Sequence, residues 1–257
     1  HQLEKLKENP HLHDSIEFNI SRSSYVFDTE DEFAVEYKDI ISPEEMHKWH
    51  QDLIEIDSLN KSTLEKNNET MLRAFSLLDE NFEYSKKENI EFIRDNMALP
   101  FTHHSRLGFV YFAQLNNLLR KDVITEAQKN SLLLSVKSIS TKMKSDAYQV
   151  KLGKKSLSSF LDIYGHIRAG NYNLSSSNLK NNLEFTELLV HNSEPQDENI
   201  SLQKVIFSNI DKYFELNNIP YNASAWVAMF QTAIATRENS KFYYTKGIDG
   251  ILNEIEK

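Results

Sequence analysis

Glycine and proline are scarce in this chain, and their scarcity limits what it can fold into. The 257 residues include only 6 Gly and 5 Pro. A fold made of many short strands needs turn residues at intervals of roughly 8–12 positions, whereas long helices need far fewer. We therefore expect a mainly α-helical protein, with residues 1–257 forming a single compact multi-helix domain.

Composition narrows the class of protein further. Hydrophobic residues make up 40% and charged residues 26%, which is typical of a globular chain with a buried core. The formal charge of -9 argues against a nucleic-acid partner, which requires clustered Lys and Arg. The absence of cysteine excludes disulfides, thiolate nucleophiles and Cys-ligated zinc. Without an apolar stretch long enough for a membrane span, we expect a cytoplasmic protein.

Capping boxes predict where several helices begin. The patterns at 42–45, 85–88 and 125–128 each place Ser or Thr three residues before Glu or Gln. We expect Pro100 to end the second of these helices. An apolar stripe from Leu132 to Val150 predicts one long third helix. Further helices are expected at 107–120, 223–242 and 248–255.

Two segments depart from the helical pattern. Residues 15–28 alternate apolar and polar side chains and carry β-branched and aromatic residues, which favours a short strand pair, or β-hairpin. Residues 165–182 are polar and too long for a tight turn, so this stretch is either a functional or a mobile loop.

The first candidate site follows Pro100, where a helix is expected to begin. His103, His104 and Arg106 lie together there. Unpaired N–H groups at a helix start attract anions, and a guanidinium can bind phosphate or carboxylate with two hydrogen bonds. In the structural alternative, Thr102 caps the helix and the histidines bond to nearby backbone.

The second candidate site is a loop in which two of the six glycines flank a histidine and an arginine. It comprises Gly165, His166, Arg168, Gly170 and Tyr172. Glycine permits a sharp bend or the close approach of a ligand. Alternatively, Gly165 ends a helix and an ordinary surface loop follows.

The third candidate site is Arg237 with Lys241, one helical turn apart on the same face. Cations near a helix C-terminus are favourable for structural reasons as well. Metal sites have weaker support. Histidine and acidic residues at 11–14 and 44–50 do not form a known zinc pattern, so we expect no metal site.

These segments together resemble a known family. The chain is similar to the helical region of phosphoenolpyruvate-utilising, pyruvate-phosphate-dikinase-like phosphotransferases and, more distantly, to rifampin phosphotransferase. The likeness runs in order along nearly the whole chain. It is carried by residues 9–14, 16–18, 102–109, 164–168, 237–238, 241–242 and 245.

The resemblance implies a division of labour within a longer protein. In that family an ATP-grasp domain phosphorylates a histidine on a mobile domain, which delivers the phosphoryl group to an acceptor. The full-length enzyme would need ATP and Mg²⁺, while this segment would bind no cofactor and be inactive alone. The family pattern has Pro, Thr and Asp where this chain has Ala169, Asn171 and Asn173. The lost carboxylate argues against magnesium binding or base catalysis by this loop.

Our leading hypothesis is that the chain binds a small anionic phosphoryl acceptor. The proposed pocket contains His103, His104, Arg106, His166 and Arg168, with Arg237 and Lys241 nearby. One alternative is a non-catalytic scaffold that docks the mobile phosphohistidine domain. Another alternative is a metal hydrolase that acts alone.

Overall fold

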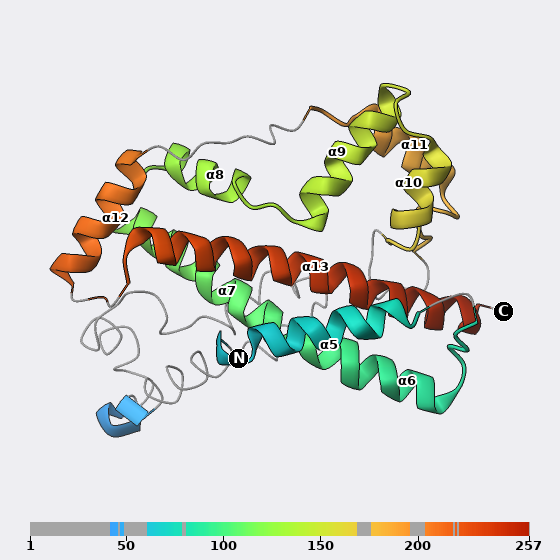
Figure 1. The fold of residues 1–257 in the computed structure, drawn as a ribbon, viewed down its shortest axis with the longest axis horizontal. Helices are drawn as coiled ribbons and strands as arrows, with labels where there is room; N and C mark the ends of the chain where they lie inside the picture. The colour runs from blue at the N-terminus through green and yellow to red at the C-terminus, as the bar shows by residue number, and fades with distance from the viewer. Residues whose placement is uncertain are drawn as a thin grey trace. The chain divides into compact units, whose positions relative to one another are not determined.

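The computed structural model describes residues 42–45, 47–48, 61–78, 81–168, 176–195, 204–217, 219 and 221–256. This part of the chain is mainly α-helical, as predicted from the scarcity of glycine and proline (Figure 1). The chain divides into two compact units, and two of the boundaries between them fall inside helices α7 (Leu99–Arg120) and α13 (Ala223–Ile255). The strand pair expected at 15–28 lies outside the described residues, and the single domain stays a prediction.

The first unit packs around a buried tryptophan. It contains α7 from Ser105 onward, most of α8 (Glu126–Leu134), α12 (Lys204–Leu216) and the start of α13. The Trp226 ring stacks on Phe230 with centroids 5.6 Å apart and meets Phe214 edge to face. Its indole N–H donates to Gln114 Oε1 at 2.9 Å, so the polar atom is satisfied inside the core.

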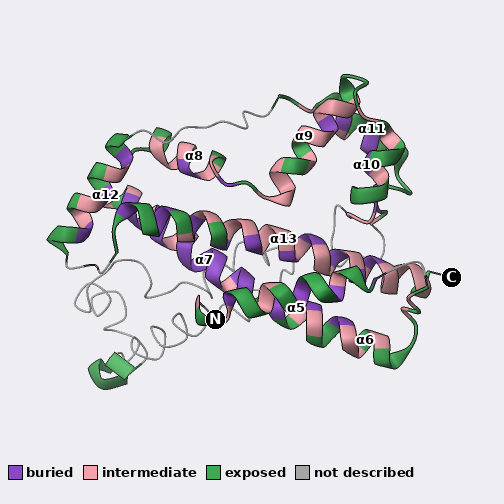
Figure 2. Cartoon of the chain, in the orientation of Figure 1, coloured by how far each residue is buried: buried purple, intermediate pink, exposed green. Residues whose placement is uncertain are grey.

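Among the described residues, the second unit has two apolar clusters. It contains nearly all of α5 (Leu64–Ser76), α6 (Lys87–Ile93), α9 (Ile139–Lys151), α10 (Leu157–Tyr164), α11 (Leu183–His191) and the end of α13. One cluster includes Met71, Ile93 and Met97, and the other includes Phe160 and Tyr164. Figure 2 shows these inward faces as buried bands on otherwise exposed or half-buried helices.

Helix α13 runs without a break for 33 residues, although we expected separate helices at 223–242 and 248–255. Two glycines within it are explained by packing. A Cβ on Gly250 would lie 2.2 Å from Tyr84 Cε1, and one on Gly247 would lie 3.1 Å from Ile93 Cγ2. The low helix propensity of glycine is therefore offset by a close approach of neighbouring side chains.

Pro100 does not end a helix, so that prediction is wrong. The chain passes from α6 through a π-helical turn, η2 (Arg94–Ala98), directly into α7. The Leu99 N–H bonds to Arg94 O, five residues back. This change of hydrogen-bonding register accommodates proline, which has no N–H to donate. The Ser85 capping box is also wrong, because α6 begins after Lys86 without a side-chain cap.

Two other capping boxes are confirmed. Glu45 N–H donates to Ser42 Oγ at 3.3 Å, and Gln128 N–H donates to Thr125 Oγ1 at 3.2 Å. The helix that follows Thr125 is shorter than expected, because Ser138 forms a new capping box and starts α9 as a separate helix. None of the helices in the described ranges combines the length and apolar composition that a bilayer crossing requires.

Candidate functional site

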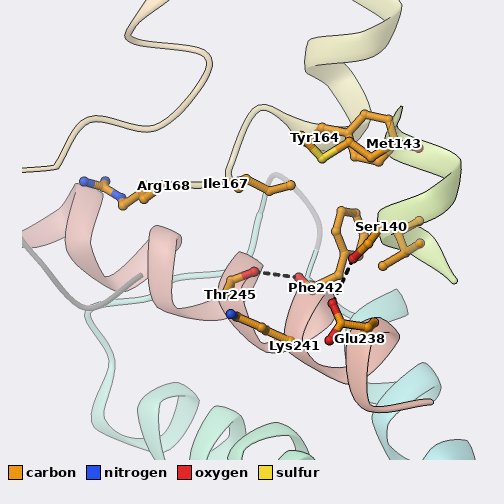
Figure 3. Close-up of a pocket in the computed structure, with 10 residues that line it drawn as sticks. Ser140, Met143, Tyr164, Ile167, Arg168, Glu238, Lys241, Phe242 and Thr245 are labelled. Carbon is orange, nitrogen blue, oxygen red and sulfur yellow. Dashed lines mark hydrogen bonds between the residues drawn. The ribbon is translucent and has the colours of Figure 1, made fainter. Parts of the chain in front are cut away.

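A pocket of about 290 Å³ opens within the second unit, where three helical segments meet (Figure 3). The first turn of α9 provides one wall, the end of α10 with the residues after it provides another, and the middle of α13 provides the third. Its lining combines apolar side chains, hydroxyls and charged groups: Ile139, Ser140, Met143, Tyr164, Ile167, Arg168, Glu238, Lys241, Phe242 and Thr245.

Side-chain hydrogen bonds fasten the start of α9 to α13. Ser138 caps α9, and Thr141 completes the capping box. The Ile139 N–H, which has no partner inside its own helix, donates to Asn239 Oδ1 at 2.9 Å. The Ser140 hydroxyl donates to Glu238 Oε2, also at 2.9 Å. These bonds hold two walls of the pocket together.

Tyr164 fixes the wall that α10 provides. Its ring is fully buried, and its hydroxyl donates to Asp146 Oδ2 at 2.8 Å. Burial and this bond to a carboxylate raise the pKa of Tyr164 above its ordinary value, so the phenol stays protonated. Burial raises the pKa of Asp146, but hydrogen bonds from Lys155, Lys142 and Tyr164 outweigh it and the net shift is downward.

Gly165 ends α10, as the structural alternative for this loop predicted. A Cβ at this position would lie 2.3 Å from Leu161 O and 3.2 Å from Lys180 Cβ. Glycine is therefore needed for close packing between the helix end and the returning chain. Three residues later, Arg168 forms an isolated antiparallel bridge with Asn178.

Arg168 reaches the pocket, but its guanidinium is already held by groups of the protein. Nε donates to Asp249 Oδ1 at 2.8 Å, and Nη1 donates to Ser176 O at 2.7 Å. Nη2 donates to Asn253 Oδ1 at 2.9 Å, and Glu256 lies 3.4 Å from Nη1. The side chain is only 3% exposed. Its main role is to join the chain after α10 to the last turns of α13.

His166 is packed against α13 rather than directed at an anion. Its ring meets Phe242 edge to face at 4.7 Å, and Nε2 lies 3.2 Å from the Phe242 carbonyl oxygen. Burial lowers the pKa of His166 to about 4, so the ring is neutral near pH 7. A neutral imidazole adds no positive charge to the site.

The histidine pair lies inside a continuous helix, so the helix start predicted at Thr102 is wrong. The Thr102 hydroxyl donates back to Ala98 O instead of capping. His103 is exposed, and Arg106 is half-buried in the part of α7 that belongs to the first unit. The continuous hydrogen-bond ladder leaves no set of unpaired N–H groups at this point to attract an anion.

His104 links two helices of the second unit. It is buried, and its Nδ1 bonds to Ser240 Oγ. The Ser240 hydroxyl donates its own proton to Thr236 O at 2.6 Å. Nδ1 must therefore carry the proton that joins the imidazole to Ser240, which fixes the tautomer. The bond joins α7 to α13.

The third predicted cluster lies in the middle of α13 rather than near its end. Arg237 donates from Nη1 to Glu238 Oε1, and Lys241 lines the pocket one turn further on. The dipole of a helix C-terminus therefore does not explain these cations. Gly170 and Tyr172 lie outside the described residues.

Sequence reasoning thus found two lining residues, Arg168 and Lys241, in separate motifs. Of the remaining predicted site residues in the described ranges, none lines the pocket: His103, His104, Arg106, Gly165, His166 and Arg237. It missed the α9 wall, although Ser138 followed by Thr141 was a usable capping signal. Asp249 and Asn178, which hold Arg168, had no sequence signal at all.

The described residues provide no candidate metal site. Within those ranges, no group of three His, Asp or Glu side chains is arranged to hold a metal ion.

Comparison of the chain with protein-family models, with curated proteins and with solved structures gave no match.

Proposed function

We propose that this chain binds the acceptor substrate of a phosphotransferase and that the acceptor occupies the pocket between α9, α10 and α13. One observation carries the proposal. Arg168 and Lys241, which belong to two motifs far apart in the sequence, line the same pocket. The sequence hypothesis places Arg168 in an anion pocket and Lys241 near it.

The charges of the pocket favour an anionic ligand. Its lining contains Arg168, which is paired with Asp249 inside the protein, a second cation, Lys241, and one carboxylate, Glu238. Both oxygens of Glu238 already accept hydrogen bonds, one from Ser140 and one from Arg237. The first turn of α9 adds the positive end of a helix dipole. A carboxylate or phosphate group is the complementary partner.

Such a site suits the acceptor side of phosphoryl transfer. This reaction depends mostly on positioning the reactants and neutralising charge, so the acceptor domain needs no covalent nucleophile. The resemblance to phosphoenolpyruvate-utilising enzymes supports the same assignment. ATP, Mg²⁺ and the phosphohistidine would then belong to an ATP-grasp domain and a mobile domain of the longer polypeptide.

Chemical-shift titration of the isotope-labelled chain with phosphoenolpyruvate tests this proposal. We expect shifts at Ile167 and Thr245, and the Lys241→Gln variant should bind about tenfold more weakly, the equivalent of about 1.4 kcal/mol. Lys144→Gln removes an exposed lysine that does not line the pocket and should have no effect. Pocket resonances that do not move at millimolar phosphoenolpyruvate, phenyl phosphate and phosphorylated acceptors would reject the assignment.

A scaffold function is the second candidate, and one observation favours it. The polar groups of Arg168 and His166 are used to hold the second unit together. In that case the 102–109, 164–168 and 237–245 segments stabilise helices, and the exterior docks the phosphohistidine domain. Shifts that occur only on addition of the catalytic domains, and at exposed residues away from the pocket, would support docking over acceptor binding.

A further inference from the structure

We infer that the acceptor is amphipathic, with a body of about one or two rings and a single anionic group, rather than a sugar or a small polar anion. This inference rests on the proposed function and deepens it. The inference is based on the uncharged side chains that line the pocket.

Apolar side chains from all three segments line the pocket. Ile139 comes from α9. Met143 also comes from α9, Ile167 follows α10, and Phe242 comes from α13 (Figure 3). Phe242 is held in place by ring contacts with Tyr164, at 5.9 Å, and with His166. Met143 adds a flexible thioether that adapts to ligands of different outline. These walls match a ring or a branched hydrocarbon.

The lining hydroxyls have already committed their protons. Ser140 donates to Glu238, and Thr245 donates to Phe242 O at 3.0 Å. Tyr164 donates to Asp146. Each of these hydroxyl groups can therefore accept a hydrogen bond from a ligand but cannot donate one without breaking a bond of the protein.

Arg168 is in a similar condition, because Asp249, Ser176 and Asn253 hold its guanidinium. A sugar has many hydroxyls, and each needs both donors and acceptors from its site. The pocket offers few donors, so a polyhydroxylated ligand would lose hydrogen bonds to water that the protein does not replace. An apolar body loses nothing of this kind and gains from leaving water.

The size of the pocket sets the scale of the ligand. Its volume is about 290 Å³. A dry cavity of roughly 150 Å³ accommodates benzene, so this space suits one or two fused rings. The anionic group would lie toward Lys241 and the first turn of α9, and the rings would contact Met143, Ile167 and Phe242.

Four ligands that differ in charge and in the polarity of the rest of the molecule test the inference on the 257-residue chain. They are 1-naphthyl phosphate, its uncharged analogue 1-naphthol, glucose 6-phosphate and inorganic phosphate. Methyl resonances of Met143 and Ile167 would report occupancy of the pocket, and titration would give each Kd. We expect 1-naphthyl phosphate to bind at least about tenfold more tightly than the other three.

Matched variants test the apolar walls of the pocket and its cation separately. Met143→Gln should weaken 1-naphthyl phosphate about tenfold, a scale typical of changes in an apolar pocket. Met143→Leu should retain the affinity, because leucine keeps the apolar volume. Leu152→Gln, at an exposed apolar position, is the control. Lys241→Gln should reduce the preference for 1-naphthyl phosphate over 1-naphthol to within about threefold.

The results also distinguish this inference from the proposal on which it rests. Glucose 6-phosphate or phosphate binding as tightly as 1-naphthyl phosphate, with Lys241 required, would overturn the amphipathic ligand and leave the anion site standing. Binding of 1-naphthol as tight as that of the phosphate would overturn both, because no anion preference would remain. Unshifted Met143 and Ile167 methyls with every probe would also overturn both. If Met143→Gln does not fold, Met143→Leu and the comparison of probes on the unmodified chain decide the matter.

Discussion

Two basic segments that look alike in the sequence have different surroundings in the fold. The 102–106 segment and the 164–168 segment each combine histidine and arginine, and each was expected at a break in a helix. The first lies inside the continuous run of η2 and α7. The second spans a helix end at Gly165 and contributes three residues, Tyr164, Ile167 and Arg168, to a pocket. Of these two segments, only the one that includes a helix end contributes to the pocket.

The largest expected difference between these segments concerns stability. Asp249→Ala should lower the free energy of unfolding by about 3–5 kcal/mol, because it leaves the buried Arg168 charge without its main partner. His103→Ala, at an exposed position in α7, should change it by less than about 0.5 kcal/mol. Urea denaturation of both variants measures this. Equal losses of unfolding free energy in the two variants would show that the Arg168 network does not stabilise the fold.

The pH dependence of stability should also separate the segments. His166 has a pKa of about 4 in the folded chain and an ordinary value of 6.5, so the unfolded state binds more protons between these values. Stability should therefore fall as the pH drops from 6.5 to 4, by up to about 3 kcal/mol. His166→Gln should flatten this part of the profile. A steep profile in His166→Gln would assign the effect to other groups.

Helix capping provides the smallest test. Ser138 caps α9 at the pocket, so Ser138→Ala should cost about 1 kcal/mol of stability. Thr102 lies within a helix and caps nothing, so Thr102→Ala should cost less than about 0.5 kcal/mol. Thermal unfolding of the pair measures the difference. A loss of about 1 kcal/mol of stability from Thr102→Ala would instead indicate that a helix begins at Thr102.

The helical class and several helix boundaries could be predicted because they depend on local chemistry. The boxes at Ser42 and Thr125 satisfy N–H groups a few residues away, and such short-range bonds can be identified from sequence alone. The π-helical turn before Pro100 could not be predicted. It depends on the register of a longer helix, and a proline within a helical pattern ordinarily marks an end.

The pocket could be predicted only in part, for a related reason. Arg168 and Lys241 have distinctive chemistry and were identified from their local sequence. Ile139 and Met143 look like ordinary core residues of an amphipathic helix. The partners of Arg168 come from α13 and from Asn178, and pairings over such distances are set by tertiary packing. A sequence therefore indicates cations more readily than it indicates what neutralises them.

The bridge between Arg168 and Asn178 has a practical consequence for altering this protein. It holds both ends of the intervening chain, while Arg168 separately anchors them to α13. Closing a longer loop adds little entropy cost, about 0.6 kcal/mol for each doubling of its length. Extra residues inserted between these two anchors should therefore cost little stability, because the anchors themselves are retained.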